Sequence, residues 1–327
     1  MNFAEFQQRR KIVLRERGDV LDCAETNLYR ALARLIPSAM PQAEGTVHRC
    51  HLAAEWAARF GLSAAAQRAL CSCGVRDSLA ILFRHYSAEN VKLWLPSDNY
   101  PVYGELARTA GLMPDWFPTL PQPCWPANAP GAAPELLVVT NPLKPLGRWL
   151  DANDEDALLS WLAADSRRRL LLDAVYTFAT EFHSSTLRLL ATNQTILLHS
   201  LTKGWLHPRL FGIALVPEAD AAALAPAFRT QPPPQPNLAR ARELIAHAIE
   251  TPISVANELA RARERLLNAL PTVHSVPQSG TALGYFTIVP GSAAEWLEKE
   301  NILGIPVTAF GSLRADLTIL SSLRFVE

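Results

Sequence analysis

Polar side chains follow apolar runs at three places in this sequence, and their types could do chemistry. The residues are Asn141 after "ELLVVT", Asp173 and Tyr176 after "RRLLL", and Ser200, Thr202 and Lys203 after "QTILLH". In an open α/β sheet, ligands bind beyond the carboxyl ends of the strands. Each group also has an ordinary interpretation, because Asn-Pro is a common turn, aspartate often caps a helix, and loop lysines are usually solvated.

A glycine turn supplies a candidate anion site. In "CSCGVRDSL", Gly74, Val75 and Arg76 come directly before an apolar helical run. The free N–H groups and the positive dipole end of a helix start favour a phosphate group. The alternative is that Gly74 only makes the turn, as most glycines before helices do.

The segments that must position these residues alternate between strand and helix patterns. Buried strands are predicted at 91–96, 135–140, 168–173 and 194–200, and helices at 51–62, 78–86, 103–112 and 154–166. Apolar runs of strand length separated by amphipathic helices are typical of parallel sheets. The sequence therefore predicts an α/β fold with a mostly parallel central sheet flanked by helices.

A proline-rich stretch, "RTQPPPQPNL" (229–238), interrupts this alternation. Three consecutive prolines continue neither a helix nor a central strand. A long helical pattern broken at Pro252 follows, and then strand-like "YFTIVP" and "DLTILSS" with a helical segment between them. We expect an N-terminal arm (1–40) that contributes to the small domain, a large domain (41–236) and a small α+β domain (237–327).

Composition excludes several classes of protein. The 31 basic residues balance 31 acidic ones, which disfavours nucleic acid or an anionic membrane as partner. The five cysteines have neither disulfide-framework nor metal-ligand spacing, so no metal site is predicted. We find no apolar run long enough to span a membrane and no secretory signal, and we expect a cytoplasmic protein.

Taken together, the order of these motifs resembles the fold-type I pyridoxal-phosphate-dependent class I/II aminotransferases. The resemblance is nearest to the branch of histidinol-phosphate aminotransferase and threonine-phosphate decarboxylase. The matching segments are "MPQAEGTVHRCHLAAEWAARFGL" as entry loop and first helix, "GVRDSL" as phosphate turn, "LPSDNYPVY" as stacking segment, and "NPLKPLG" as Asn-Pro repeat.

The resemblance implies a role for each candidate residue. Lys203 would form a Schiff base with pyridoxal 5'-phosphate and later shuttle the substrate Cα proton. Asp173 would keep the pyridinium nitrogen protonated, Tyr176 and Asn141 would donate to the phenolic oxygen, and Tyr100 would stack on the ring. The phosphate would be held by Gly74, Val75, Arg76, Ser200, Thr202 and Arg209. The resemblance also implies a homodimer and small-molecule amino donors and acceptors.

Three departures from the family pattern concern the cofactor. Arg209 follows Lys203 by six residues instead of the usual eight, and Phe211 stands at the usual place. Lys144 replaces the second asparagine of the Asn-Pro repeat, where we expect it to be peripheral. The entry loop has Met40 before Pro41, where relatives carry a tyrosine that reaches the partner subunit.

A fourth departure concerns the substrate. In the final strand, Asp316 stands where the family has a carboxylate-binding arginine, and Arg314 lies two residues earlier. Period-two alternation would put Arg314 on the same strand face and allow it to bind the substrate. Alternatively, Asp316 selects a cationic group, or it faces solvent.

Three functions follow as hypotheses. The first is transamination of an amino acid or related amine. The second is another pyridoxal-phosphate reaction on an amino acid, such as decarboxylation, cyclisation or oxidation. The third is a binding protein that has lost its chemistry.

Overall fold

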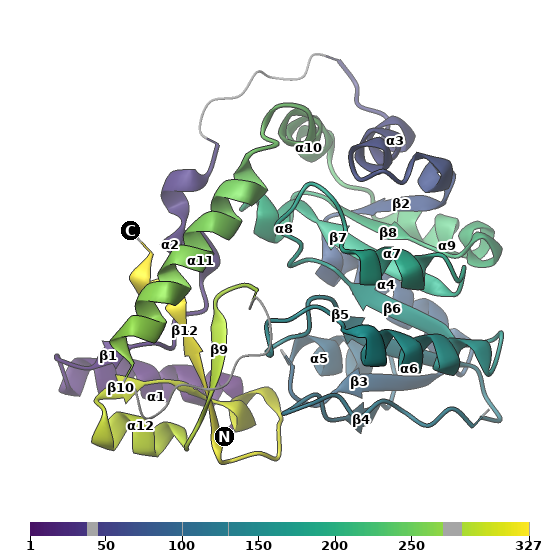
Figure 1. Cartoon of the computed structure of the whole chain (residues 1–327). Helices are drawn as coiled ribbons and strands as arrows, with labels where there is room; N and C mark the ends of the chain where they lie inside the picture. Colours follow the sequence, from purple (N-terminus) through teal and green to yellow (C-terminus); the bar gives the residue numbers. More distant parts are fainter. Residues whose placement is uncertain (38–44, 100, 130, 271–282, 327) are drawn as a thin grey trace.

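The described residues form a central sheet and a smaller sheet that pack together (Figure 1). This computed structural model describes residues 1–37, 45–99, 101–129, 131–270 and 283–326, so Met40, Pro41 and Tyr100 lie outside the described residues. No helix in these ranges is both long and apolar enough to cross a membrane.

The central sheet has seven strands in the order β2-β8-β7-β6-β5-β3-β4. They are β2 (Ala69–Ser72), β3 (Lys92–Pro96), β4 (Asp115–Phe117), β5 (Glu135–Thr140), β6 (Arg169–Asp173), β7 (Thr195–Ser200) and β8 (Gly212–Leu215). The strands from β4 to β7 pair in parallel, whereas β8 is antiparallel to both of its neighbours. The predicted mostly parallel sheet is confirmed.

Helices cover both faces of this sheet because its strands are apolar on both sides. In β5, Leu137 and Val139 pack into one core and Leu136 and Val138 into the other. The first core is closed by α3 (Arg49–Arg59), α6 (Ala152–Ala163), α7 (Ser184–Leu190) and α10 (Gln235–His247). The second is closed by α4 (Val75–Ala88), α5 (Val102–Thr109) and α9 (Glu218–Thr230). Alternate strand residues thus serve opposite layers.

The two ends of the chain meet in a second unit. Its sheet is antiparallel in the order β11-β12-β9, with β9 (Phe286–Pro290), β11 (Ile305–Pro306) and β12 (Leu317–Ser321). From the N-terminal part, α1 (Phe3–Glu16) packs on this unit, and β1 (Leu21–Asp22) pairs with β10 (Ile302–Leu303). In Figure 1, α1 lies beside α12 (Ala293–Lys299), and α11 (Thr251–Ala269) runs along the unit.

The proline-rich stretch lies within the large unit. Pro232, Pro233 and Pro234 stand in the short connection between α9 and α10, whereas Pro236 and Asn237 lie inside α10. Leu238, Ala241 and Leu244 of that helix belong to the core of the large sheet. The predicted boundary at 237 therefore falls within a helix of the large unit, and the domain division stays a prediction.

Candidate functional site

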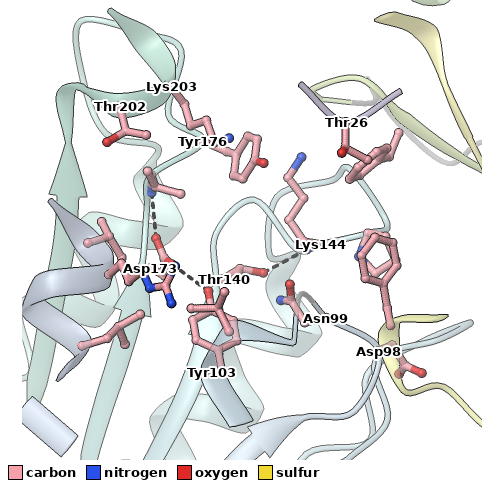
Figure 2. Close-up of a pocket in the computed structure, with 18 of the residues that line it drawn as sticks. Thr26, Asp98, Asn99, Tyr103, Thr140, Lys144, Asp173, Tyr176, Thr202 and Lys203 are labelled. Atoms are coloured by element: carbon pink, nitrogen blue, oxygen red, sulfur yellow. Dashed lines mark hydrogen bonds between the residues drawn. The ribbon is translucent and has the colours of Figure 1, made fainter. Parts of the chain in front are cut away.

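A cavity of about 320 Å³ opens at the carboxyl ends of β5, β6 and β7 and is closed on its other side by the small unit (Figure 2). Parallel strands bring their ends to one edge of a sheet, so residues far apart in sequence meet there. Five of the predicted site residues line this cavity together: Arg76, Asp173, Tyr176, Thr202 and Lys203.

Lys203 lies in the short helix α8 (Leu201–Gly204), directly after β7. Its Nζ is 5.3 Å from the ring centroids of both Tyr176 and Tyr29. Burial lowers the pKa of this amine to about 8, and the nearby Asp173 partly opposes the shift. A lysine with such a pKa supplies a substantial fraction of the neutral, nucleophilic amine under mildly alkaline conditions.

Asp173 ends β6 and is held by two donors. The Tyr103 hydroxyl donates to Oδ2 at 2.6 Å, and the backbone N–H of Val175 donates to Oδ1 at 3.0 Å. Burial raises the pKa of the Asp173 carboxyl, although both hydrogen bonds and Lys203 act in the opposite direction. A cationic ring nitrogen brought into the cavity would stabilise the ionised form.

The N-terminus of α4 forms another wall of the cavity. Gly74 has φ 137, a conformation that few other residues adopt. A Cβ on Gly212 of β8 would lie 2.7 Å from the Gly74 Cα, so glycine at 212 is what allows this close approach. Val75, Arg76 and Thr202 line the cavity here, and the first-turn N–H groups of a helix lack intrahelical partners.

Lys144 lies in the cavity wall and not at the periphery, which corrects the prediction. Its Nζ lies 3.5 Å from the Tyr176 ring centroid, 5.1 Å from that of Tyr285 and 5.2 Å from that of Phe286. The side chain is 5% exposed, and Nζ has no hydrogen-bond partner among the described residues. Burial and the charge of Lys203 lower the pKa of this amine to about 7.

Tyr176 is tied to the small unit by its hydroxyl group. The Tyr176 and Tyr285 hydroxyl oxygens are 3.1 Å apart, and the Tyr285 hydroxyl donates to the Thr26 carbonyl at 3.4 Å. Burial and the neighbouring Tyr285 raise the pKa of Tyr176 well above its ordinary value. The phenol is therefore a neutral hydrogen-bonding group in the cavity wall.

The structure corrects the placement of Asn141. Its Nδ2 donates to the hydroxyls of Ser185 and Thr186 at 2.9 Å each, and its Oδ1 accepts the Leu150 N–H at 3.1 Å. These bonds hold the side chain between β5 and α7, away from the cavity lining. Lys144, three residues on, takes the place beside the cavity.

Two predicted phosphate contacts are also corrected. Ser200 is buried, and its Oγ accepts the Thr202 N–H at 3.3 Å as the cap of α8. Arg209 is exposed, has φ 56, and accepts a hydrogen bond from Asn237 through its carbonyl. Neither side chain lines the cavity, so the α4 terminus and Thr202 form this end of the site.

Arg314 and Asp316 bind each other and not the cavity. The Arg314 Nε and Nη2 donate to the two Asp316 carboxylate oxygens at 2.7 and 2.6 Å. Their side chains are 39% and 64% exposed, and neither lines the cavity. The prediction that one of them contacts the substrate is therefore corrected.

Sequence reasoning missed several residues of the site: Tyr103, Lys144, Tyr285, Phe286, Phe310, Phe3 and Thr26. Tyr103 was inside a predicted helix and Tyr285 inside a predicted strand, where an aromatic residue usually means core packing. For Lys144 the sequence does hold an indication: it is a single lysine in the apolar, proline-rich segment "NPLKPLG", where a buried side chain is more easily expected than a solvated one.

Similarity to known proteins is found in structure and not in sequence. No family model matches the chain, and no curated protein matches its sequence. An aspartate aminotransferase double mutant of Thermus thermophilus superposes with a TM-score of 0.73 at 20% identity, covering 99% of this chain and 92% of that one. An aromatic aminotransferase of Pyrococcus horikoshii gives 0.71 at 13% identity, covering 97% and 94%.

A structure from Erwinia carotovora, provisionally assigned as a histidinol-phosphate aminotransferase, gives a TM-score of 0.67 at 14% identity and covers 93% of this chain and 91% of that one. It matches no better than the aspartate and aromatic enzymes, so the predicted branch is not singled out. This chain has the fold of the pyridoxal-phosphate-dependent aminotransferases.

Proposed function

We propose that the protein is a pyridoxal-phosphate-dependent aminotransferase that acts on an amino acid through Lys203. The observation that carries the proposal is the meeting of Lys203, Asp173 and the α4 terminus in one cavity. An amine for the cofactor aldehyde, a carboxylate for its ring nitrogen and free N–H groups for its phosphate make up a donor set that fits this group.

When bound, pyridoxal phosphate supplies an electron sink for the bonds at the substrate Cα. Lys203 would hold the cofactor aldehyde and, once displaced by the substrate amine, would move the proton at Cα. Asp173 would hold a proton on the ring nitrogen, and Tyr103 would fix the carboxylate that does so. Val75, Arg76 and Thr202 would hold the phosphate at the other end of the cavity.

From the family resemblance we also propose a homodimer and small-molecule amino donors and acceptors. A cytoplasmic location is proposed from the sequence pattern and not from the resemblance. Decarboxylation or another reaction at Cα is the alternative on the same residues, because the choice depends on which Cα bond stands perpendicular to the cofactor ring.

Absorbance spectroscopy of the purified protein with added pyridoxal phosphate tests the proposal. We expect a visible band of lysine-bound cofactor in the wild type and in Lys299→Ala, an exposed control, and none in Lys203→Ala. Conversion to the pyridoxamine form on addition of one amino acid selects transamination. Consumption of the amino acid without that conversion selects the alternative, and absence of any band refutes both.

A further inference from the structure

Lys144 carries a cationic group that the described part of the protein leaves without an acceptor. The rings of Tyr176, Tyr285 and Phe286 surround its Nζ, which is buried and makes no hydrogen bond to a described residue. Aromatic faces attract an ammonium group, but they do not replace the hydrogen bonds lost on leaving water. An anion from a ligand would supply what the protein does not.

The position of Lys144 indicates which anion this is. Figure 2 shows Lys144 and Lys203 both pointing toward Tyr176, with Thr202 on the far side of Lys203. A phosphate at the α4 terminus would therefore be bound by Val75, Arg76 and Thr202 and not by Lys144. An anion on Lys144 would lie beside the amine of Lys203, where the reacting carbon of a substrate must come.

Other cations do not compete for this role. Besides Lys144 and Lys203, the only cationic side chain among the described lining residues is Arg76, which belongs to the α4 terminus. Arg314 is held by Asp316 outside the cavity. A carboxylate bound to the substrate Cα is therefore left with Lys144 as its partner.

We infer that Lys144 binds the carboxylate of the amino-acid substrate, in place of an arginine from the last strand. The inference rests on the proposed function, because it takes the substrate to be an amino acid that reacts at Lys203. Lys144 is then a residue that determines specificity, because its ammonium group binds one carboxylate at a fixed place beside the reacting carbon.

The wall around Lys144 also indicates the side chain of that substrate. The rings of Phe3 and Phe310 stack with their centroids 5.1 Å apart. The ring centroids of Tyr285 and Phe286 are 4.4 Å apart, and all four rings line the cavity. The Asp98 carboxylate accepts the backbone N–H of Thr119 and Leu120, and Figure 2 shows it turned away from Lys144. These surfaces favour an apolar, aromatic-sized side chain over a charged one.

Two small probes and two matched variants test the inference by calorimetry. 3-Phenylpropionate carries the carboxylate, and 3-phenylpropionamide is its neutral counterpart of similar shape. Wild type, Lys144→Met and the exposed control Lys299→Met are titrated with each probe, both with and without pyridoxal phosphate. At pH 6.5 we expect wild type and Lys299→Met to prefer the carboxylate roughly tenfold, the worth of a charge-assisted hydrogen bond, and Lys144→Met to show no preference.

The preference should also depend on pH in one direction. Only protonated Lys144 attracts the carboxylate, so the preference should fall as pH rises above about 7, the pKa of this amine. The titratable groups facing Lys144 are Lys203, Tyr176 and Tyr285, and Lys203 titrates near pH 8. Because Lys203 is present in both proteins, the difference between wild type and Lys144→Met isolates the contribution of Lys144.

Thermal unfolding shows whether Lys144→Met folds. Removing a buried, unpaired ammonium should raise the unfolding temperature of the cofactor-free protein at pH 6. The difference in unfolding temperature between Lys144→Met and the wild type should narrow above pH 7. Burial lowers the pKa of the Lys144 amine from 10.5 to about 7 in the folded protein, so the wild type loses its buried charge, and the cost of that charge, as the pH rises past 7.

Two results would overturn the inference. In the first, Lys144→Met binds both probes as the wild type does and keeps the carboxylate preference. In the second, it binds both probes more weakly by the same factor, as expected of a residue that only packs. If Lys144→Met keeps the preference and changes only the cofactor band, the amine serves the phenolic oxygen of the cofactor instead. A Lys144-dependent preference without any cofactor band would leave the carboxylate site standing and refute the proposed function.

Discussion

The two ends of the cavity are built in opposite ways. At the end that we propose for the cofactor, the polar groups are fixed by the protein itself: Tyr103 and Val175 hold Asp173, and glycines bring β8 against the start of α4. At the end that we propose for the substrate, Lys144 stands among aromatic rings with no acceptor among the described residues. The difference indicates that one end is preorganised for a group of constant shape, whereas the other is completed by a ligand.

Among the substitutions that test this difference, Asp173→Asn should cause the largest loss of turnover. The neutral amide cannot stabilise a protonated ring nitrogen, so turnover should fall by roughly 10²- to 10³-fold, as when one preorganised electrostatic partner is removed. The band of lysine-bound cofactor should persist because Lys203 is intact. Stopped-flow measurement of the conversion to the pyridoxamine form checks this, with the exposed Asp156→Asn as control. Full activity in Asp173→Asn would contradict the assignment.

A smaller effect is expected from Gly212→Ala at the same end. The added methyl group would stand 2.7 Å from the Gly74 Cα and would displace the start of α4. A misplacement of about 1 Å in an active site can cost on the order of 10²-fold in rate. We expect a fall in turnover of that order, together with weaker binding of pyridoxal phosphate in an absorbance titration. Gly18→Ala is the matched control, because a Cβ there meets nothing within 4 Å; equal affinity in both variants would show that the close approach is unimportant.

The smallest effect is expected from Arg314→Ala. Exposed ion pairs contribute little, and this arginine touches Asp316 and not the cavity, so KM for the amino acid should change less than about twofold. Steady-state kinetics of Arg314→Ala beside Asp316→Ala provide the measurement. A tenfold rise in KM confined to Arg314→Ala would return the carboxylate to this residue and remove the need for Lys144.

The central strands β3, β5, β6 and β7 are predictable because their apolar runs are unambiguous. β5, β6 and β7 are buried along their whole length or nearly so, and residues directly after a parallel strand reach the ligand edge of the sheet. This is why the sequence puts Asp173 and Lys203 at the ligand edge of the sheet, whereas their shared cofactor site is what the family resemblance implies. The short strands β2, β4 and β8 are not among the predicted segments, so the antiparallel pairing of β8 is not predicted either.

Loop residues could not be placed in the same way. After β5 the chain turns back to form a bridge between Leu143 and Arg148, and the path of that turn decides that Lys144 faces the cavity and Asn141 does not. Spacing in sequence does not contain that path. The position of Arg209 is not predictable for a related reason. Arg209 has a left-handed backbone conformation in the loop after α8 and an exposed side chain, and spacing in sequence reveals neither.

One feature of the N-terminal arm bears on how the protein is handled. Phe3 stacks on Phe310 and lines the cavity, while Met1 is 49% exposed. Any sequence fused ahead of Met1, such as an affinity tag, would begin at the rim of the binding cavity. A histidine-rich tag there would place bulky side chains beside the cavity and obstruct small ligands, so the titrations require protein from which such a tag has been cleaved.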